Sequence, residues 1–160
     1  GVALDQNQTR LAVLNVPDRP GVAAKLLDSL AQKGISLDMI IQSQPDRGLN
    51  NIAFTIARGD RFLAEQTLKS TALELGCGEV LWDDQIAKLS IVGMGMAQAK
   101  GIAAQMFQSL ADRGINIEMI ATSEIKVSCV IRQSMAVEAL QAVHQCFNLG
   151  GDRAIPIEQG

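Results

Sequence analysis

An internal repeat is the feature that most constrains how this chain folds. Residues 21–43 (GVAAKLLDSLAQKGISLDMIIQS) align without a gap on residues 101–123 (GIAAQMFQSLADRGINIEMIATS), 80 residues further along the chain. The two segments are identical at eleven positions, and most other pairs are conservative, such as Val22 with Ile102. A gap-free match of this extent predicts that the chain consists of two copies of one structural unit.

The first copy alternates between strand and helix patterns. Segments rich in apolar and β-branched residues predict four strands, at residues 9–16, 35–43, 50–57 and 77–82. An apolar stripe with helical spacing predicts a helix over residues 20–33 that Gly34 ends, and a second helix is predicted to begin near Asp60, a suitable N-cap. The resulting order, βαββαβ, predicts an α+β ferredoxin-like fold, in which two helices cover one face of a four-stranded antiparallel sheet.

The second copy repeats this order but lacks a clear last strand. Its strands are predicted at residues 87–93, 115–123 and 125–131, and its helices at residues 101–113 and 134–147. Residues 154–159 (AIPIEQ) have only a weak strand pattern, whereas residues 2–4 (VAL) have no counterpart in the first copy. We therefore expect the N-terminal strand, within residues 1–4, to complete the second unit. The predicted domains are residues 5–84 and residues 85–160.

The composition excludes several classes of protein. The chain has 160 residues, of which 48% are hydrophobic and 19% charged, as in ordinary globular proteins. The net charge of -3 and the 3% aromatic content argue against a nucleic-acid partner, and no apolar run is long enough to span a membrane. Three cysteines without CxxC spacing predict reduced thiols in a cytoplasmic protein and no metal site. No nucleophile with a positioned base and no phosphate-binding loop is evident, so we expect no catalytic residue and no cofactor.

The turn before the first helix, VPDRPG at residues 16–21, is the strongest candidate for binding a ligand. Pro20 suits the first helical position, and Gly21 allows a ligand to approach the backbone closely. The amide N–H groups of Gly21, Val22 and Ala23 would lie at the positive end of the helix dipole, where a carboxylate binds, and Asp18 could bind an ammonium group. Together these groups describe a site for an α-amino acid. The alternative is a plain strand-to-helix connection that Asp18 caps.

Polar residues at two strand ends are weaker candidates. Gln42 and Ser43 end one predicted strand, and Thr122, Ser123 and Glu124 occupy the matching place in the second copy. These side chains could bind a ligand or a partner strand, and solvation of the strand ends is an equally good interpretation.

Three segments carry a resemblance to a known family. They are residues 16–43 (VPDRPGVAAKLLDSLAQKGISLDMIIQS), 81–93 (LWDDQIAKLSIVG) and 115–126 (INIEMIATSEIK). These segments resemble the paired ACT domains of bacterial aspartate kinases, and the resemblance covers nearly the whole chain. It implies a regulatory role, either as a β-type subunit or as part of a longer kinase. Aspartate kinases phosphorylate aspartate with ATP, but whether this chain itself counts as an enzyme stays open, because no kinase domain is recognised in it.

The resemblance also implies partners and effector-binding residues. The implied partners are L-threonine and/or L-lysine as effector, a homodimer in which the first ACT unit of one chain pairs with the second unit of the other, and a kinase catalytic domain or alpha subunit. Uncovered sheet edges independently favour a dimer. The effector-binding residues that it implies are Asp18, Arg19, Pro20, Gly21, Val22, Ala23, Ser36, Leu37, Asp38, Gln42, Ile102, Ala103, Asn116, Ile117, Ser123 and Glu124. The second turn, AQAKG at residues 97–101, lacks the prolines of the first, and we expect it to complete a site across the dimer interface.

Three other functions stay open on the sequence alone. The chain could be an ACT-type sensor of a different amino-acid enzyme, or a purely structural dimerisation module. It could also be a small acylphosphatase-like enzyme, in which Arg19 would hold a phosphate group.

Overall fold

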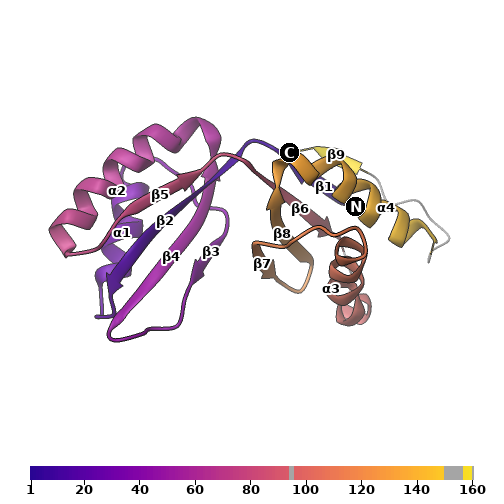
Figure 1. Ribbon diagram of the computed structural model, residues 1–160, viewed down its shortest axis with the longest axis horizontal. Helices are drawn as coiled ribbons and strands as arrows, with labels where there is room; N and C mark the ends of the chain where they lie inside the picture. Colours follow the sequence, from indigo (N-terminus) through magenta and orange to yellow (C-terminus); the bar gives the residue numbers. More distant parts are fainter. Residues whose placement is uncertain (94–95, 150–156, 160) are drawn as a thin grey trace. The chain divides into compact units, whose positions relative to one another are not determined.

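The structure is a computed structural model that describes residues 1–93, 96–149 and 157–159. The chain forms two compact units (Figure 1). The first unit comprises residues 8–84, and the second comprises residues 1–7 together with the described residues from 85 onward. Among the described residues, no helix is long and apolar enough to cross a membrane.

The first unit has the predicted βαββαβ order. Its elements are β2 (Gln8–Pro17), α1 (Val22–Ala31), β3 (Ile40–Gln42), β4 (Leu49–Ala57), the short 3-10 helix η1 (Arg58–Asp60), α2 (Arg61–Leu75) and β5 (Val80–Asp83). The strands form an antiparallel sheet in the order β3-β4-β2-β5 (Figure 1). Alternate residues of β2 and β4, such as Leu11 and Phe54, pack against Leu26 and Leu30 of α1 and Leu68 of α2. Both helices therefore cover the same face of the sheet.

Helix α1 ends at Ala31, two residues before the predicted end, and it begins later than predicted, although Gly34 closes it with the expected C-terminal geometry. Gly34 adopts a left-handed conformation (φ 75°), and its N–H donates to Ala31 O at 2.9 Å, while the next N–H, of Ile35, donates to Leu30 O at 3.1 Å. This is the bond pattern of a Schellman C-cap. The helix begins at Val22, so the expectation that Pro20 is its first residue is wrong. Gly21 is the N-cap with φ 90°, a left-handed conformation that interrupts the helix between Pro20 and Val22.

The strand predicted over residues 35–43 is shorter than expected. Only Ile40–Gln42 forms a regular strand, β3. Immediately before it, the Met39 N–H donates to the side-chain Oγ1 of Thr55 at 3.0 Å instead of to a backbone carbonyl. Because this bond replaces a ladder bond, regular pairing with β4 starts one residue later, and residues 35–39 follow an irregular path.

The second unit is completed by the N-terminal strand, as predicted. Its elements are β1 (Val2–Asp5), β6 (Ile86–Val92), α3 (Met96–Ala111), β7 (Met119–Thr122), β8 (Lys126–Arg132), the 3-10 helix η2 (Gln133–Met135), α4 (Ala136–Leu149) and β9 (Ile157–Gln159). The sheet order is β7-β8-β6-β1-β9. Strand β1 pairs antiparallel with β6, as β5 does with β2 in the first unit, and its Val2 and Leu4 are buried in the core with Leu89. The weak pattern at residues 154–159 does contain a strand, β9, which pairs parallel with β1; residues 150–156 lie outside the described residues.

Helix α3 begins earlier than predicted. The sequence placed its start at Gly101, whereas the structure starts it at Met96, so residues 97–101 lie inside the helix and do not form a turn. Residues 97–100 are Ala, Gln, Ala and Lys, all strong helix formers, where the first unit has Pro17 and Pro20 around its turn. The two turns that are 80 residues apart in sequence are therefore not equivalent in structure.

Candidate functional site

The turn between β2 and α1 lies at one end of the sheet of the first unit. The Asp18 N–H donates to Gly48 O at 2.8 Å, and the Arg19 N–H donates to Pro17 O at 2.9 Å. Gly48 is at the tip of the hairpin between β3 and β4, where it and Arg47 are both left-handed, as in a type I′ turn. The hairpin tip and residues 18–21 therefore lie side by side, and residues 18–21 are all exposed.

The first turn of α1 leaves backbone donors available. Within the described part of the chain, the N–H groups of Gly21 and Ala23 have no hydrogen-bond partner. The Val22 N–H donates to Arg19 O at 3.3 Å, so only two of the three expected donors are available. A Cβ atom on Gly21 would meet no atom within 4 Å, so there is open space beside the backbone at this residue. Two unpaired N–H groups at a helix N-terminus suit a carboxylate, and the exposed Asp18 adds a negative charge beside them.

Asn50 lies next to this turn and was not singled out from the sequence. It is the first residue after Leu49 in β4 and lies opposite Val16 in the sheet register. Its side chain is only 4% exposed, and its Oδ1 atom is buried without a hydrogen-bond partner among the described residues. The sequence could have pointed to Asn50, because it lies two residues before Ile52 in a strand pattern whose alternate positions face the core.

The other residues of the first unit that the family resemblance implies in effector binding lie at opposite ends of the sheet. Gln42 is exposed in β3 opposite Ile52, on the half of the sheet nearer the turn. Ser43 follows it and is engaged in strand pairing, because its Oγ accepts the N–H of Asn51 at 2.9 Å. Residues 36–38 precede β3 at the opposite end, where the Asp38 N–H donates to Thr55 O at 2.9 Å. Within the first unit, the structure therefore groups residues 18–23 with Gln42 and separates them from Ser36, Leu37 and Asp38.

The implied residues of the second unit are also dispersed. Ile102 and Ala103 are half-buried on α3 and pack against the core of that unit. Asn116 and Ile117 precede β7, in a segment that is tied to β8 by a two-bond ion pair of Glu118 with Arg132, at 2.6 Å and 3.1 Å. The last two, Ser123 and Glu124, are exposed in the turn between β7 and β8, where the Ser123 N–H donates to Lys126 O at 2.8 Å.

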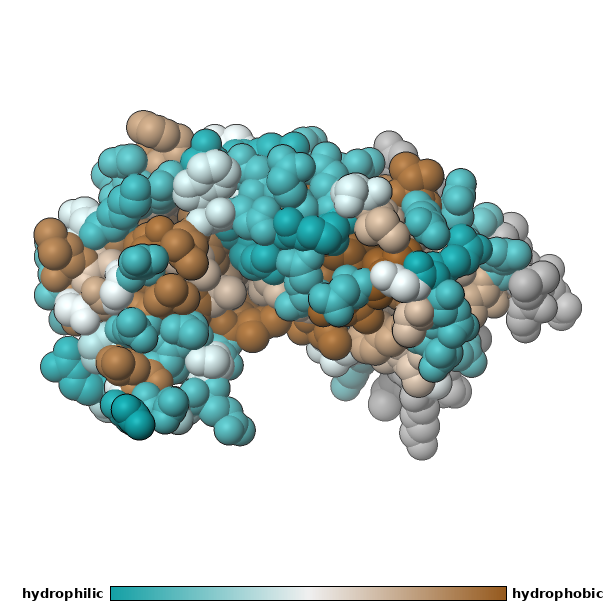
Figure 2. Space-filling model, viewed as in Figure 1, coloured by the Kyte–Doolittle hydropathy of each residue, from teal (hydrophilic) through white to brown (hydrophobic). Residues whose placement is uncertain are grey.

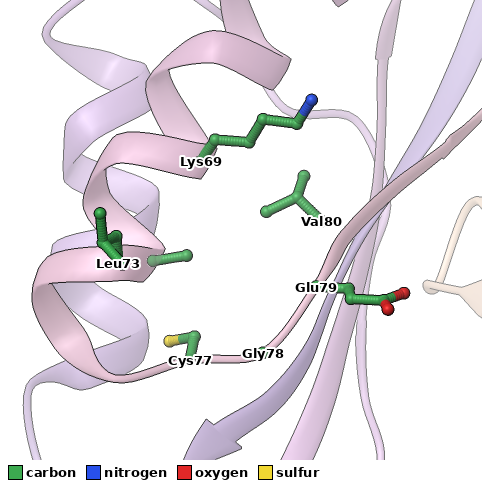
Figure 3. Close-up of a pocket in the computed structure, with 7 residues that line it drawn as sticks. Lys69, Leu73, Cys77, Gly78, Glu79 and Val80 are labelled. Atoms are coloured by element: carbon green, nitrogen blue, oxygen red, sulfur yellow. The ribbon is translucent and has the colours of Figure 1, made fainter.

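A cavity of about 340 Å³ opens between α2 and β5 of the first unit. Figure 3 shows Lys69 and Leu73 on α2, and Cys77 and Val80 on the segment that leads into and begins β5. The Lys69 ammonium group already pairs with Glu65 at 2.9 Å, and Glu79 points away from the cavity in Figure 3. Burial raises the pKa of the Cys77 thiol, and the nearby charge of Arg19 lowers it in part. The cavity therefore lies near the turn but does not present the paired donors and acceptors that an amino acid needs.

Nothing else in the described residues forms a reactive centre. No group of three or more His, Cys, Asp or Glu side chains in the described part of the chain could hold a metal ion. Cys129 is buried in the core of the second unit, and burial raises the pKa of its thiol to about 12. Figure 2 shows apolar residues scattered among hydrophilic ones over the first unit. The turn before α1 is thus the best candidate site, and its chemistry is binding.

Comparison with known proteins agrees with this architecture. The ACT domain family matches residues 9–71, and a second ACT domain model matches residues 89–147. An aspartate kinase of Pseudomonas fluorescens is 42% identical over 160 residues, which cover 100% of this chain and 38% of that protein. This chain thus spans about two fifths of the length of that curated relative.

Two solved structures are similar over nearly their full length. The ligand-free regulatory subunit of aspartate kinase from Thermus thermophilus is 44% identical, with a TM-score of 0.86 and coverage of 92% of this chain and 97% of that chain. The crystal structure of aspartokinase alpha and beta subunits gives 42% identity, a TM-score of 0.86 and the same coverage. This chain therefore belongs to the aspartate kinase family, within which it matches the regulatory region built from two ACT domains.

Proposed function

We propose that this chain is the amino-acid sensor of an aspartate kinase, the enzyme that converts ATP and L-aspartate to 4-phospho-L-aspartate. It binds an end product of the pathway, L-threonine or L-lysine, and thereby inhibits the kinase. Its partners are the catalytic domain or alpha subunit of the kinase and a second copy of the regulatory chain.

The turn before α1 is the observation that carries this proposal. The unpaired N–H groups of Gly21 and Ala23 are placed to receive the α-carboxylate of an amino acid, and the exposed carboxylate of Asp18 is placed to receive its α-ammonium group. The counterpart segment in the second unit, residues 97–101, is inside α3 and offers no such N-terminus. The first unit therefore supplies the groups that hold the amino-acid backbone.

Solved relatives support the choice of effector and partner. Among them, E. coli aspartokinase III was solved in complex with lysine and aspartate in the T-state; it is 25% identical, with a TM-score of 0.65 and coverage of 91% of this chain and 32% of that chain. The structure of aspartokinase alpha and beta subunits supports assembly with a catalytic partner.

Matching edge strands support a dimer of regulatory chains. Ile40 in β3 and Ile120 in β7 are 80 residues apart in sequence, lie on strands that end their sheets, and are 48% and 45% exposed. Open edges with exposed apolar residues favour pairing with another strand. An effector that binds at such a pairing stabilises one arrangement of the dimer, and it shifts the kinase only through its different affinity for the active and inactive states. A coupling free energy of about 1–3 kcal/mol is sufficient for this response.

Titration calorimetry with threonine and with lysine tests the proposal. We expect saturable binding of at least one of them to the wild-type chain. The affinity should fall in Asp18→Ala, which loses the partner of the ammonium group, and in Gln42→Ala, on the same half of the sheet. Unchanged affinity in both variants would refute the site, and no heat or thermal shift with either amino acid would leave a structural dimerisation module as the function.

A further inference from the structure

We propose that Asn50 is a specificity-determining residue of this site. Its amide oxygen accepts a hydrogen bond from a hydroxyl group on the effector side chain, so the effector is a β-hydroxy amino acid. This inference rests on the proposed function and names the class of amino acid that the site takes.

The buried oxygen of Asn50 is the first observation behind this inference. The side chain is 4% exposed, and Oδ1 is shielded from solvent and unpaired among the described residues. A buried acceptor without a donor is destabilising, and folded proteins rarely retain one. Where local rules for stability are broken in this way, a functional site is the usual reason.

The position of Asn50 brings this oxygen to the turn before α1. Asn50 and Ile52 lie on the same face of β4, and Ile52 is in the core beneath the helices. Val16, the register partner of Asn50, is in the same core cluster as Val22, the first residue of α1. The Asn50 side chain is therefore on the helix side of the sheet, at the end where α1 begins.

The surroundings favour a neutral donor of short reach. Val16, Val22 and Ile52, the core residues beside Asn50, are all apolar, so a lysine ammonium group placed among them would be buried without an opposite charge from these side chains. A hydroxyl group carries no such penalty. Val16 is only two residues before Asp18, so an amino acid held at the turn needs only a short side chain to reach Asn50. Because the oxygen is shielded in the unbound chain, the effector reaches it only when the residues that cover it move.

The second unit offers a natural contrast. The N–H groups of Asp38 and Glu118, which are repeat counterparts, donate to Thr55 O and Val130 O, so these two acceptors occupy equivalent positions. Counting back five residues along the chain from each acceptor, the counterpart of Asn50 is Ile125, which immediately precedes β8, is 64% exposed and has no side-chain acceptor. The recognition of a hydroxyl group is thus a property of the first unit alone.

Calorimetry with threonine and valine tests the inference, because valine has the shape of threonine without its hydroxyl group. The wild-type chain should bind threonine at least about tenfold more tightly than valine, since a site that bonds a hydroxyl rejects the analogue that lacks it. In Asn50→Leu the threonine affinity should fall to that of valine, and the valine affinity should not change. Gln66→Leu, an exposed site on α2, is the matched control and should behave as wild type.

The outcomes separate this inference from the proposed function. If Asn50→Leu keeps the wild-type ratio of the two affinities, or if the wild-type chain binds lysine and not threonine, then Asn50 does not read a hydroxyl group although the effector site stands. If the wild-type chain binds no amino acid, the proposed function fails, and this inference fails with it. Should Asn50→Leu not fold, the side-chain NH₂ resonances of Asn50 in the wild-type chain provide the answer. They should shift with threonine and not with valine, and equal shifts would overturn the inference.

Discussion

Replacement of Gly21 by alanine separates the conformational role of this residue from its role in binding. Gly21 has φ 90°, where an L-residue costs about 1–2 kcal/mol. A Cβ atom there meets nothing within 4 Å, so no steric cost is added. The alanine also restricts the unfolded chain, which offsets roughly 0.4–1 kcal/mol. We expect a net loss of about 1 kcal/mol, which lowers the melting temperature of a unit of this size by about 4–8 °C.

Gly34→Ala is the matched control for this change. Gly34 ends the same helix with φ 75°, and a Cβ atom there also meets nothing within 4 Å. Its conformational cost is therefore the same, but it lies at the opposite end of α1 from the candidate site. The two variants should lose similar stability in calorimetric melting.

The affinities of the two variants should differ. In Gly21→Ala the added methyl group occupies the open space beside the Gly21 backbone, where the ligand is expected to approach, so the affinity for threonine or lysine should fall by about tenfold or more, which corresponds to about 1.4 kcal/mol. In Gly34→Ala the affinity should equal that of the wild-type chain. Equal affinities in both variants, measured by titration calorimetry at a temperature where both are folded, would refute the argument that ligands approach the backbone at Gly21.

Three further changes test the fold itself. Leu4→Ala should destabilise the second unit by about 2–5 kcal/mol and reduce hydrogen-exchange protection in that unit only. Leu11→Ala should have the same effect on the first unit only. Loss of protection in the first unit of Leu4→Ala would contradict the assignment of β1 to the second unit. Because burial raises the pKa of Cys129 from 9.0 to about 12, its contribution to stability should be complete below pH 9 and should be lost as the pH rises toward 12, at about 1.4 kcal/mol per pH unit. Urea denaturation at several pH values should show this loss in the wild-type chain and not in Cys129→Ala. If the free energy of unfolding falls equally with pH in both proteins, the assigned role of Cys129 is wrong. Gly78→Ala should lower the free energy of unfolding by about 1–3 kcal/mol, because its Cβ atom would lie 2.9 Å from the backbone oxygen of Leu14. A urea midpoint equal to that of the wild-type chain would show that Gly78, just before β5, lies farther from β2.

The sequence was sufficient to predict the architecture because the repeat supplied the same evidence twice. The order of strands and helices followed from periodicity, and the lack of a clear last strand in the second copy pointed to residues 2–4, which the structure places in β1. Segment lengths were less predictable. The start of β3 depends on the bond from Met39 to the Thr55 side chain, a contact between residues 16 apart that no local pattern encodes.

The candidate site was predictable in part. Prolines and a glycine before an amphipathic helix correctly pointed to an exposed helix N-terminus with free donors. The conformation of Gly21 and the bond that occupies the Val22 N–H depend on how the turn closes, which the composition of the turn does not determine. Asn50 was missed because its importance comes from the absence of a partner in three dimensions.

Backbone amide chemical shifts measured during titration with threonine and with lysine test the central claim most directly. If the turn before α1 holds the amino-acid backbone, the resonances of Gly21 and Ala23 should shift strongly and saturably with the effector, and those of Gly34 and Gly114, which follow the C-terminal ends of α1 and α3, should shift much less. Saturable binding with no shift at Gly21 and Ala23, or with equal shifts at Gly34 and Gly114, would contradict the account.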